Sequence, residues 1–190
     1  MDHHSEAGLT IVSGPRRSGK STLARELVAS GERRLIVDPL GEHGSMGRVL
    51  TLEDIHDWIG RGGGRGSWSV CTDVEETEAD LVLRLVWELP PTSILVDEAD
   101  LLGRSEALSL LCRYGRHAGH PTILCTRRPA DLPPRARSNA CRVIVFRTWE
   151  RTDVDYFRSV LPEGASDALD SLPEWGFVDA DLRSGSWRIS

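Results

Sequence analysis

The sequence predicts a three-layer α/β fold in which a mostly parallel central sheet carries helices on both faces. Short apolar runs rich in valine, isoleucine and leucine alternate along the chain with longer amphipathic stretches. A strand buried on both faces reads as such an apolar run, and a helix between two strands returns the chain for parallel pairing. With 190 residues and 39% hydrophobic content, the chain can bury one sizeable core. We therefore expect residues 1–190 to form one domain.

Periodicity, caps and breakers place the elements in order. The predicted strands are 9–13, 34–38, 67–72, 93–97, 122–126 and 142–147, and the predicted helices are 18–30, 51–60, 75–89, 101–117 and 152–160. Thr51 caps the second helix, which has Glu53 and Asp54 in its first turn. The glycine-rich stretch 60–66 must be a loop. The segments 176–179 and 186–189 indicate a C-terminal β-hairpin.

The loop between the first strand and the first helix matches the pattern G-x-x-x-x-G-K-[ST]. It consists of Gly14, Pro15, Arg16, Arg17, Ser18, Gly19, Lys20 and Ser21, with Thr22 directly after it. Lys20 is the only lysine among the 23 lysines and arginines of the chain, and a slim ammonium reaches between phosphates where a planar guanidinium does not fit. Backbone N–H groups of such a loop surround phosphates, while the Ser21 hydroxyl is placed to bind Mg²⁺. The loop predicts a site for ATP and Mg²⁺; the alternative is a chance glycine turn before a helix.

Two acids end the predicted strand 93–97. Asp97 would hold the Mg²⁺ shell, and Glu98 would polarise the water that attacks the nucleotide. The alternative is a helix cap, because acids favour the first turn of a helix and Ala99 begins a helical stretch. A second carboxylate next to the metal ligand favours hydrolysis over simple nucleotide binding.

Composition excludes some classes of protein. The formal net charge of −6 argues against a uniformly basic nucleic-acid coat. No apolar run approaches the roughly 20 residues of a membrane span, and residues 1–6 lack the features of a signal peptide. We expect a soluble protein in the cytoplasm.

The cysteines and histidines give no metal-site signature. Cys71, Cys112, Cys125 and Cys141 contain no C-x-x-C pair, so we expect buried reduced thiols. His117 and His120 are three residues apart without a thiol or an acid cluster beside them, which disfavours a metal role.

Several short segments, taken in order, resemble the ATPases of the FtsK and HerA superfamily, which pump DNA or open it. Residues 38–42 (D-P-L-G-E) are similar to the superfamily's D-P-x-G-E segment, and 116–119 to its R-x-x-G. Residues 126–129 (T-R-R-P) are similar to T-Q-R-P, and S-x-x and F-R segments follow at 138–140 and 146–147. The resemblance runs from about residue 9 to about residue 180. It implies a P-loop NTPase fold of the RecA and FtsK type.

The resemblance implies roles for three further residues. Arg116 matches an arginine that reaches into the neighbouring subunit's nucleotide site, an arginine finger in trans. The alternative is that Arg116 caps the preceding helix, where a cation suits the negative end of the dipole. Arg127 stands where the superfamily has a glutamine that senses the third phosphate. The guanidinium either contacts that phosphate or points elsewhere and leaves the sensing to Thr126.

A DNA motor needs local cations along the path of the strand. The candidates are Arg61 and Arg65 in the glycine loop, and Arg135 and Arg137 in the segment that follows Arg127. Contacts of this kind give affinity without reading sequence. The alternative is that these are ordinary surface arginines.

The sequence looks most like the minimal genome-packaging ATPases of viruses with internal membranes. This resemblance implies a homo-oligomeric ring, a pentamer or hexamer, that acts on double-stranded DNA in the host cytoplasm or on the virion, with a capsid vertex or a membrane protein as a further partner. A cellular HerA-like translocase in repair or defence is the alternative within the class. A phosphotransferase or nucleotide kinase, and a nucleotide-dependent interaction module without motor activity, are alternatives from other classes.

Overall fold

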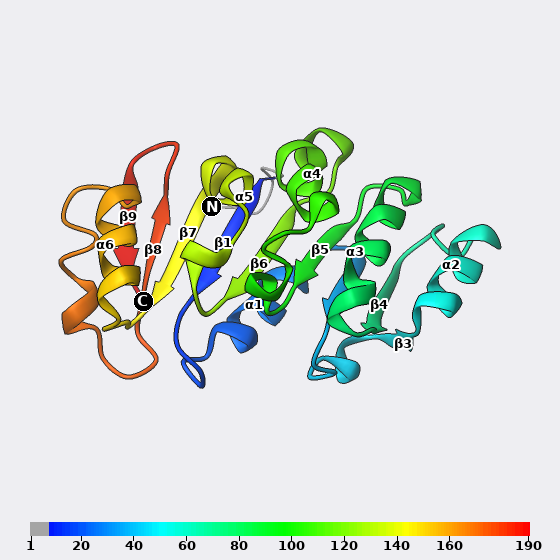
Figure 1. Ribbon diagram of the computed structural model, residues 1–190, viewed down its shortest axis with the longest axis horizontal. Coiled ribbons are helices and arrows are strands. Elements are labelled where there is room, and N and C mark those ends of the chain that lie inside the picture. The colour runs from blue at the N-terminus through cyan, green and yellow to red at the C-terminus, as the bar shows by residue number, and fades with distance from the viewer. Residues whose placement is uncertain (1–7) are drawn as a thin grey trace.

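A nine-stranded sheet runs the length of the structure, a computed structural model that describes residues 8–190 (Figure 1). Within these residues the strand order is β3-β4-β2-β5-β6-β1-β7-β8-β9. The pairs from β3 to β7 are parallel, and β7-β8 and β8-β9 are antiparallel. The strands are β1 (Leu9–Ser13), β2 (Arg33–Asp38), β3 (Arg48–Leu50), β4 (Trp68–Asp73), β5 (Ser93–Val96), β6 (Thr122–Thr126), β7 (Ala140–Phe146), β8 (Phe177–Asp181) and β9 (Ser186–Ile189).

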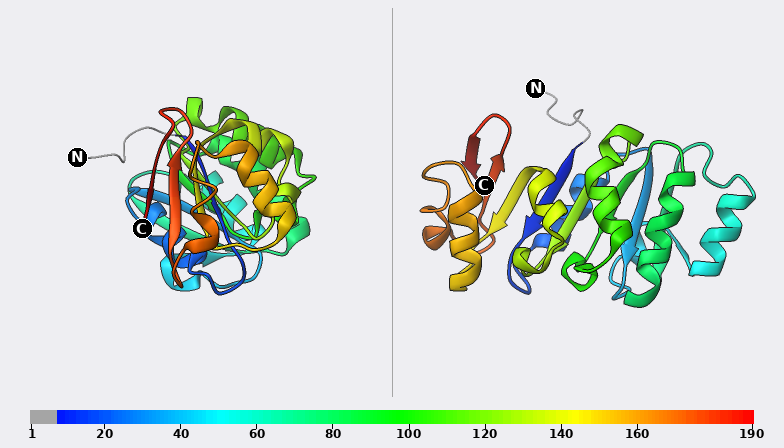
Figure 2. Two further views of the ribbon diagram at one scale, coloured as in Figure 1. Left: turned by 90° about the vertical axis from the view of Figure 1, so that its left-hand side faces the viewer. Right: turned by 45° about the horizontal axis from the view of Figure 1, so that its top comes forward.

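Helices cover both faces of the sheet (Figure 2). The α-helices are α1 (Lys20–Val28), α2 (Leu52–Gly60), α3 (Glu76–Leu85), α4 (Glu106–Tyr114), α5 (Pro134–Asn139) and α6 (Arg151–Val160). Helix α1 packs on one face, where its Ala24 and Val28 meet Val12 of β1. Helices α2 to α6 pack on the other face, to which Ile11 of β1 belongs. Consecutive residues of a strand point to opposite faces, so a fully apolar strand serves both layers.

The predicted fold class is confirmed, including the mostly parallel sheet and the C-terminal hairpin β8-β9. Thr51 caps α2 as expected, in a reciprocal capping box with Asp54. The prediction of a single helix over 101–117 is wrong. A 3₁₀ turn at Ala99–Leu102 comes first, α4 begins only after Ser105, whose side chain accepts a hydrogen bond from the backbone N–H of Leu108, and a second 3₁₀ turn follows it.

The parallel topology gives the sheet two different edges. Segments that leave the parallel strands lie at one edge, here called the carboxyl edge, and segments that enter them lie at the other, the amino edge (Figure 1). In sheets of this kind, ligands bind at the carboxyl ends of the strands. Among the described residues, no helix is long and apolar enough to cross a membrane. Residues 1–6, for which we expected no signal peptide, lie outside the described part of the chain.

Candidate active site

The predicted phosphate loop connects β1 to α1 at the carboxyl edge. Arg17 and Gly19 adopt left-handed backbone conformations, with φ of 64° and 96°. A side chain at Gly19 would be strained by this φ and would meet Phe146 and Trp175 at 3.4 and 3.5 Å. The glycine is therefore required by the left-handed turn, whereas the two contacts are ordinary van der Waals distances.

The start of α1 is prepared for an anion. Gly19 provides no capping side chain, and no acid lies in the first turn of this helix within the described chain. Lys20 is 5% exposed, and no described residue forms an ion pair with its ammonium. The hydroxyl oxygen of Ser18 is buried without a hydrogen-bond partner among the described residues. Free helix N–H groups, an uncompensated ammonium and an unpaired hydroxyl together fit phosphate oxygens.

Asp97 and Glu98 lie at the end of β5, at the same edge. Asp97 is buried, and its Oδ1 accepts a hydrogen bond of 2.9 Å from the backbone N–H of Glu98. Burial would raise the pKa of Asp97, but the hydrogen bond from His43, the bond from Glu98 and the nearby Lys20 ammonium together lower this pKa below its usual range. Asp97 is therefore ionised at neutral pH. Glu98 has a left-handed φ of 48°, and its side chain does not cap the turn that follows.

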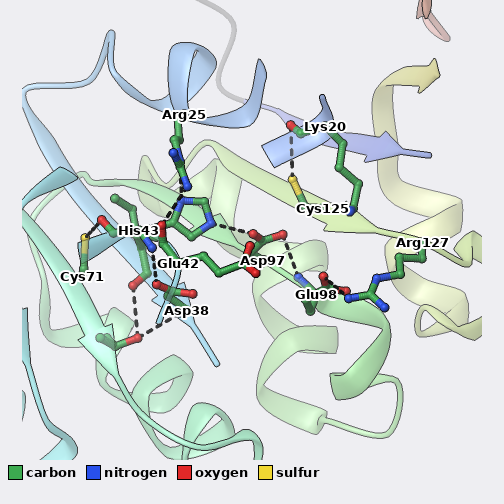
Figure 3. A network of polar contacts seen from close by, with 12 residues as sticks. Lys20, Arg25, Asp38, Glu42, His43, Cys71, Asp97, Glu98, Cys125 and Arg127 are labelled. Atoms are coloured by element: carbon green, nitrogen blue, oxygen red, sulfur yellow. Dashed lines mark hydrogen bonds and ion pairs between the residues drawn. The ribbon is translucent and has the colours of Figure 1, made fainter. Parts of the chain in front are cut away.

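A chain of three side chains ends on Asp97 (Figure 3). Nε of Arg25 in α1 donates to Nδ1 of His43 at 2.9 Å, and Nε2 of His43 donates to Oδ2 of Asp97 at 2.5 Å. His43 is fully buried in the segment that leaves β2. Because β2 and β5 are neighbours in the sheet, their carboxyl ends bring these two residues together.

Arg127, at the position where the resemblance places a phosphate-sensing glutamine, points at Glu98. Its guanidinium donates to Oε1 of Glu98 at 2.6 Å, and this hydrogen bond raises the pKa of Arg127. The other carboxylate oxygen, Oε2, receives no hydrogen bond from the described residues. Thr126 is fully buried, and its hydroxyl accepts from the backbone N–H of Arg128 at 3.1 Å. Both alternatives for Arg127 stay predictions; in the described structure its guanidinium contacts Glu98.

The other predicted site residues lie at the amino edge, away from the phosphate loop. Arg116 follows α4 and precedes β6, and its Nε donates to His117 at 3.2 Å. Arg116 lies in the last turn of the 3₁₀ helix Gly115–Ala118, where a cation suits the helix dipole, so its role as a helix cap stays an alternative. Since β6 alone spans about 13 Å at 3.3 Å per residue, Arg116 cannot reach the phosphate loop of its own chain.

The four candidate DNA-contact arginines also lie on segments that enter strands. Arg61 forms an exposed i,i+4 pair with Asp57, and Arg65 is exposed in the same loop. Arg135 is exposed on α5, whereas Arg137 is half-buried with its guanidinium 5.9 Å from the ring of Tyr156. Arg137 is therefore partly engaged in packing α5 against α6.

The residues present fit a magnesium ion that arrives with a nucleotide. Ser21 offers a half-buried hydroxyl in the first turn of α1, and Asp97 offers an ionised carboxylate. Among the described residues, no group of three or more histidines, cysteines or acids could hold a metal ion alone. Mg²⁺ usually takes one or two protein oxygens and completes its shell with phosphates and waters.

The cysteines behave as buried thiols. All four are free and buried. Burial raises the pKa of Cys71 to about 11 and that of Cys112 to about 12, so neither is a reactive thiolate at neutral pH. His117 and His120 belong to no metal cluster in the described part of the chain.

The sequence reasoning gave no role to His43 or Arg25. His43 directly follows the D-P-L-G-E segment, but its contact with Asp97 spans 54 positions. The signal that could have found it is the strand order, because a polar residue just after β2 must lie beside the acids just after β5. The sequence reasoning also gave no role to Trp175, which is 59% exposed and whose ring lies beside Gly19 of the phosphate loop.

The sequence matches no protein-family model and no curated protein. Among solved structures, the genome packaging NTPase B204 from Sulfolobus turreted icosahedral virus 2 is similar, with a TM-score of 0.78 in its complex with ATP-gammaS. The two sequences are 21% identical, and the match covers 97% of each chain. The chain has the fold of a genome-packaging NTPase. The predicted resemblance to minimal packaging ATPases is thus confirmed at the level of the fold.

Two further structures share this architecture more distantly. EccC from Thermomonospora curvata (ATPases 2 and 3, with a signal sequence peptide) matches with a TM-score of 0.63 and 16% identity; the match covers the whole of this chain and 37% of EccC. The N-terminal domain of zonular occludens toxin from Neisseria meningitidis matches with a TM-score of 0.53 and 14% identity, over 98% of this chain and 94% of that one.

Proposed function

We propose that this chain is an ATP-hydrolysing DNA translocase that packages a double-stranded DNA genome into a viral capsid. One observation carries the proposal: the match to the packaging NTPase B204 covers 97% of both chains, so the two chains share one fold over almost the whole of the matched length. The arrangement of the carboxyl edge supports hydrolysis, because the phosphate loop after β1 and the two acids after β5 lie at the same edge of one sheet, with only β6 between the two strands.

Each residue at the carboxyl edge has a proposed task. The Lys20 ammonium would pair with the outer phosphates, and Ser21 and Asp97 would hold Mg²⁺. When bound, Mg²⁺ would supply positive charge to the phosphate oxygens. Glu98 would polarise the attacking water through Oε2, the oxygen that Arg127 leaves free. The remaining residues of 14–22, with Thr126 and Arg127, would line the nucleotide.

The position of Arg116 supports the proposed ring. This arginine is exposed at the amino edge and cannot reach the phosphate loop of its own chain, so a role as arginine finger requires a neighbouring subunit. A homo-oligomeric ring of five or six subunits meets that requirement. The proposal extends to a partner at the capsid vertex or in a membrane, and to a place in the host cytoplasm or on the virion.

The amino edge is also the proposed DNA path. Arg61, Arg65 and Arg135 are exposed there, and the i,i+4 pair of Arg61 with Asp57 is too exposed to hold the guanidinium strongly. Arg137 contributes less, because it is half-buried beside Tyr156. Phosphate contacts at this edge would be independent of sequence, as a translocating motor requires.

Release of inorganic phosphate from ATP, with and without double-stranded DNA of mixed sequence, tests the proposal. We expect release that DNA stimulates several-fold, and DNA binding that weakens steeply as salt increases. A nucleotide kinase would instead transfer phosphate to an acceptor, and an interaction module would turn over slowly with or without DNA. Phosphate release that ignores DNA would contradict the proposal. A cellular HerA-like translocase remains the alternative if stimulation is found without a capsid partner.

A further inference from the structure

The imidazole of His43 has two polar partners, one on each side of the ring. Arg25 donates to Nδ1 and Asp97 accepts from Nε2 (Figure 3). An arginine side chain is always protonated and has no acceptor. Nδ1 must therefore carry a lone pair, and the ring proton must lie on Nε2. The contact with Arg25 thus fixes the tautomer that donates to Asp97, as a second partner fixes the tautomer of many functional histidines.

The backbone of His43 is held without help from the ring. Its N–H donates to Oδ2 of Asp38 at 2.7 Å, and its carbonyl accepts from Sγ of Cys71 at 3.1 Å and from the N–H of Met46 at 2.8 Å. Arg25 also donates to the carbonyl of Glu42 at 2.8 Å. The segment after β2 is therefore anchored by several independent bonds. The two ring nitrogens are left to bridge Arg25 on one side and Asp97 on the other.

We propose that His43, oriented by Arg25, is a positioning residue that holds the Asp97 carboxylate in place for Mg²⁺. The inference rests on the proposed function, in which Asp97 binds the metal. His43 fixes Oδ2 and the backbone N–H of Glu98 fixes Oδ1, so both oxygens of the carboxylate have a defined direction. Partners outside the metal shell orient metal ligands in this way, and their loss typically costs about 10- to 100-fold in metal affinity. Arg25 lies one turn beyond Ser21 on α1, so the same helix positions the proposed hydroxyl ligand and, through His43, the proposed carboxylate ligand.

The test compares two substitutions of His43 that differ in hydrogen bonding. His43→Gln keeps a donating amide nitrogen three bonds from Cβ, as Nε2 is, and adds an amide oxygen that can accept a hydrogen bond. His43→Leu keeps similar bulk and removes both functions. The readout is the affinity for a fluorescent ATPγS derivative, measured with excess Mg²⁺ and with excess EDTA, and expressed as the ratio of the two dissociation constants. This ratio isolates the contribution of the metal, which a general loss of packing would not change selectively.

The parent should bind the probe more tightly with Mg²⁺. His43→Leu should lose about 10- to 100-fold of that ratio, whereas His43→Gln should stay within about threefold of the parent. Arg25→Met should lower the ratio in the parent background and have no further effect in the His43→Leu background. Cys71→Ser is the matched control, because Cys71 contacts the backbone of His43 and not its ring; it should keep the parent ratio.

A parent-like ratio in His43→Leu would overturn the proposal, and so would equal losses in His43→Leu and His43→Gln. If His43→Leu does not fold, Arg25→Met decides, since a parent-like ratio in that folded variant contradicts the orienting role. Failure of the proposed function is a separate result: a parent that binds no nucleotide, or that releases phosphate without response to DNA, would reject the motor itself.

Discussion

Lys20, Asp97 and Glu98 lie close together at the carboxyl edge but have different proposed tasks. Lys20 is nearly buried without an ion-pair partner in the described chain, so its charge is available to phosphates. Asp97 is fixed on both oxygens, whereas Glu98 is fixed on one. A fixed carboxylate suits a metal ligand, and a carboxylate with one free oxygen suits a residue that must contact water.

Substitution should separate nucleotide binding from hydrolysis. Lys20→Ala should not bind ATP at concentrations that saturate the parent, because it removes the charge that pairs with the phosphates. Glu98→Gln should bind ATP but release phosphate at least about 100-fold more slowly, since general base catalysis contributes about 10² to 10⁴ in rate. Equilibrium binding and phosphate release on the same samples check both. Hydrolysis at the parent rate in Glu98→Gln would show that Glu98 has no catalytic role.

The ion pair between Arg127 and Glu98 should be measurable as a coupling in stability. The guanidinium is partly exposed, but the Glu98 side chain is 8% exposed, so Arg127→Gln leaves a nearly buried carboxylate with a weaker partner. We expect a coupling of about 1 kcal/mol in a double-mutant cycle of Arg127→Gln and Glu98→Gln, below the roughly 1.5 to 3 kcal/mol of hydrogen bonds to charged groups because the guanidinium is partly exposed. Denaturant unfolding of the four proteins provides the cycle. Additive effects would mean that the two side chains do not interact in solution.

At the scale of elements, the sequence predicted best what depends on local patterns. The six longer parallel strands and the C-terminal hairpin follow from apolar runs and turn residues. Strand β3 was missed because three residues carry no periodic signal. Helix α5 was missed because it has six residues and starts at a proline. The prediction of a single helix over 101–117 was wrong because the leucine spacing continues through Gly103, so the sequence pattern shows no break there. In the structure Gly103 lies against the backbone of Asp131, where an added Cβ would be 2.3 Å from the carbonyl oxygen.

The candidate site divides in the same way. The phosphate loop and the acids after β5 are local motifs, so the sequence was sufficient to name them. The contacts from His43 to Asp97 and from Arg127 to Glu98 cross from one strand end to a neighbouring one. They depend on the order β2-β5-β6, which no local pattern contains.

Helix α6 carries a buried acid that should make stability depend on pH. Burial, followed by the nearby Glu150, raises the pKa of Asp153 from 3.8 to about 6. Between these two values the unfolded chain loses a proton that the folded chain keeps, so Asp153 lowers stability as pH rises through this window. The full shift corresponds to about 3 kcal/mol, which we reduce to about 1 kcal/mol for solvent screening at this helix terminus.

Asp153→Asn should therefore have a free energy of unfolding about 1 kcal/mol higher than that of the parent at pH 7.5 and nearly equal to it at pH 4. Denaturant unfolding at both pH values measures this. Asp155→Asn, which changes a more exposed carboxylate on the same helix, serves as the control. A gain for Asp153→Asn that is equal at both pH values would contradict the assigned cause.

At the scale of the whole molecule, the two edges of the sheet have different proposed roles. The carboxyl edge holds the nucleotide residues, and the amino edge presents Arg116 and the candidate DNA contacts. An arginine on the edge away from its own phosphate loop can complete a site only in another subunit. Catalysis would then be a property of the interface.

Mixing two inactive variants tests this arrangement. Arg116→Ala should bind ATP normally and hydrolyse it slowly, since arginine fingers contribute about 10³ to 10⁵ in rate. Mixed with Lys20→Ala, it should recover part of the activity, because an intact phosphate loop of one variant can face an intact Arg116 of the other. Once subunit exchange has been shown, activity no higher than the sum of the separate variants would refute the trans assignment.

Movement along DNA is the central claim, and displacement of a third strand measures it most directly. A fluorescent oligonucleotide is bound as a triplex to double-stranded DNA, and its release is followed after ATP is added. We predict release that requires ATP hydrolysis, does not occur with ATPγS and is lost in Lys20→Ala and Glu98→Gln. DNA-stimulated phosphate release by the parent with no displacement of the triplex strand would contradict the assignment as a translocase.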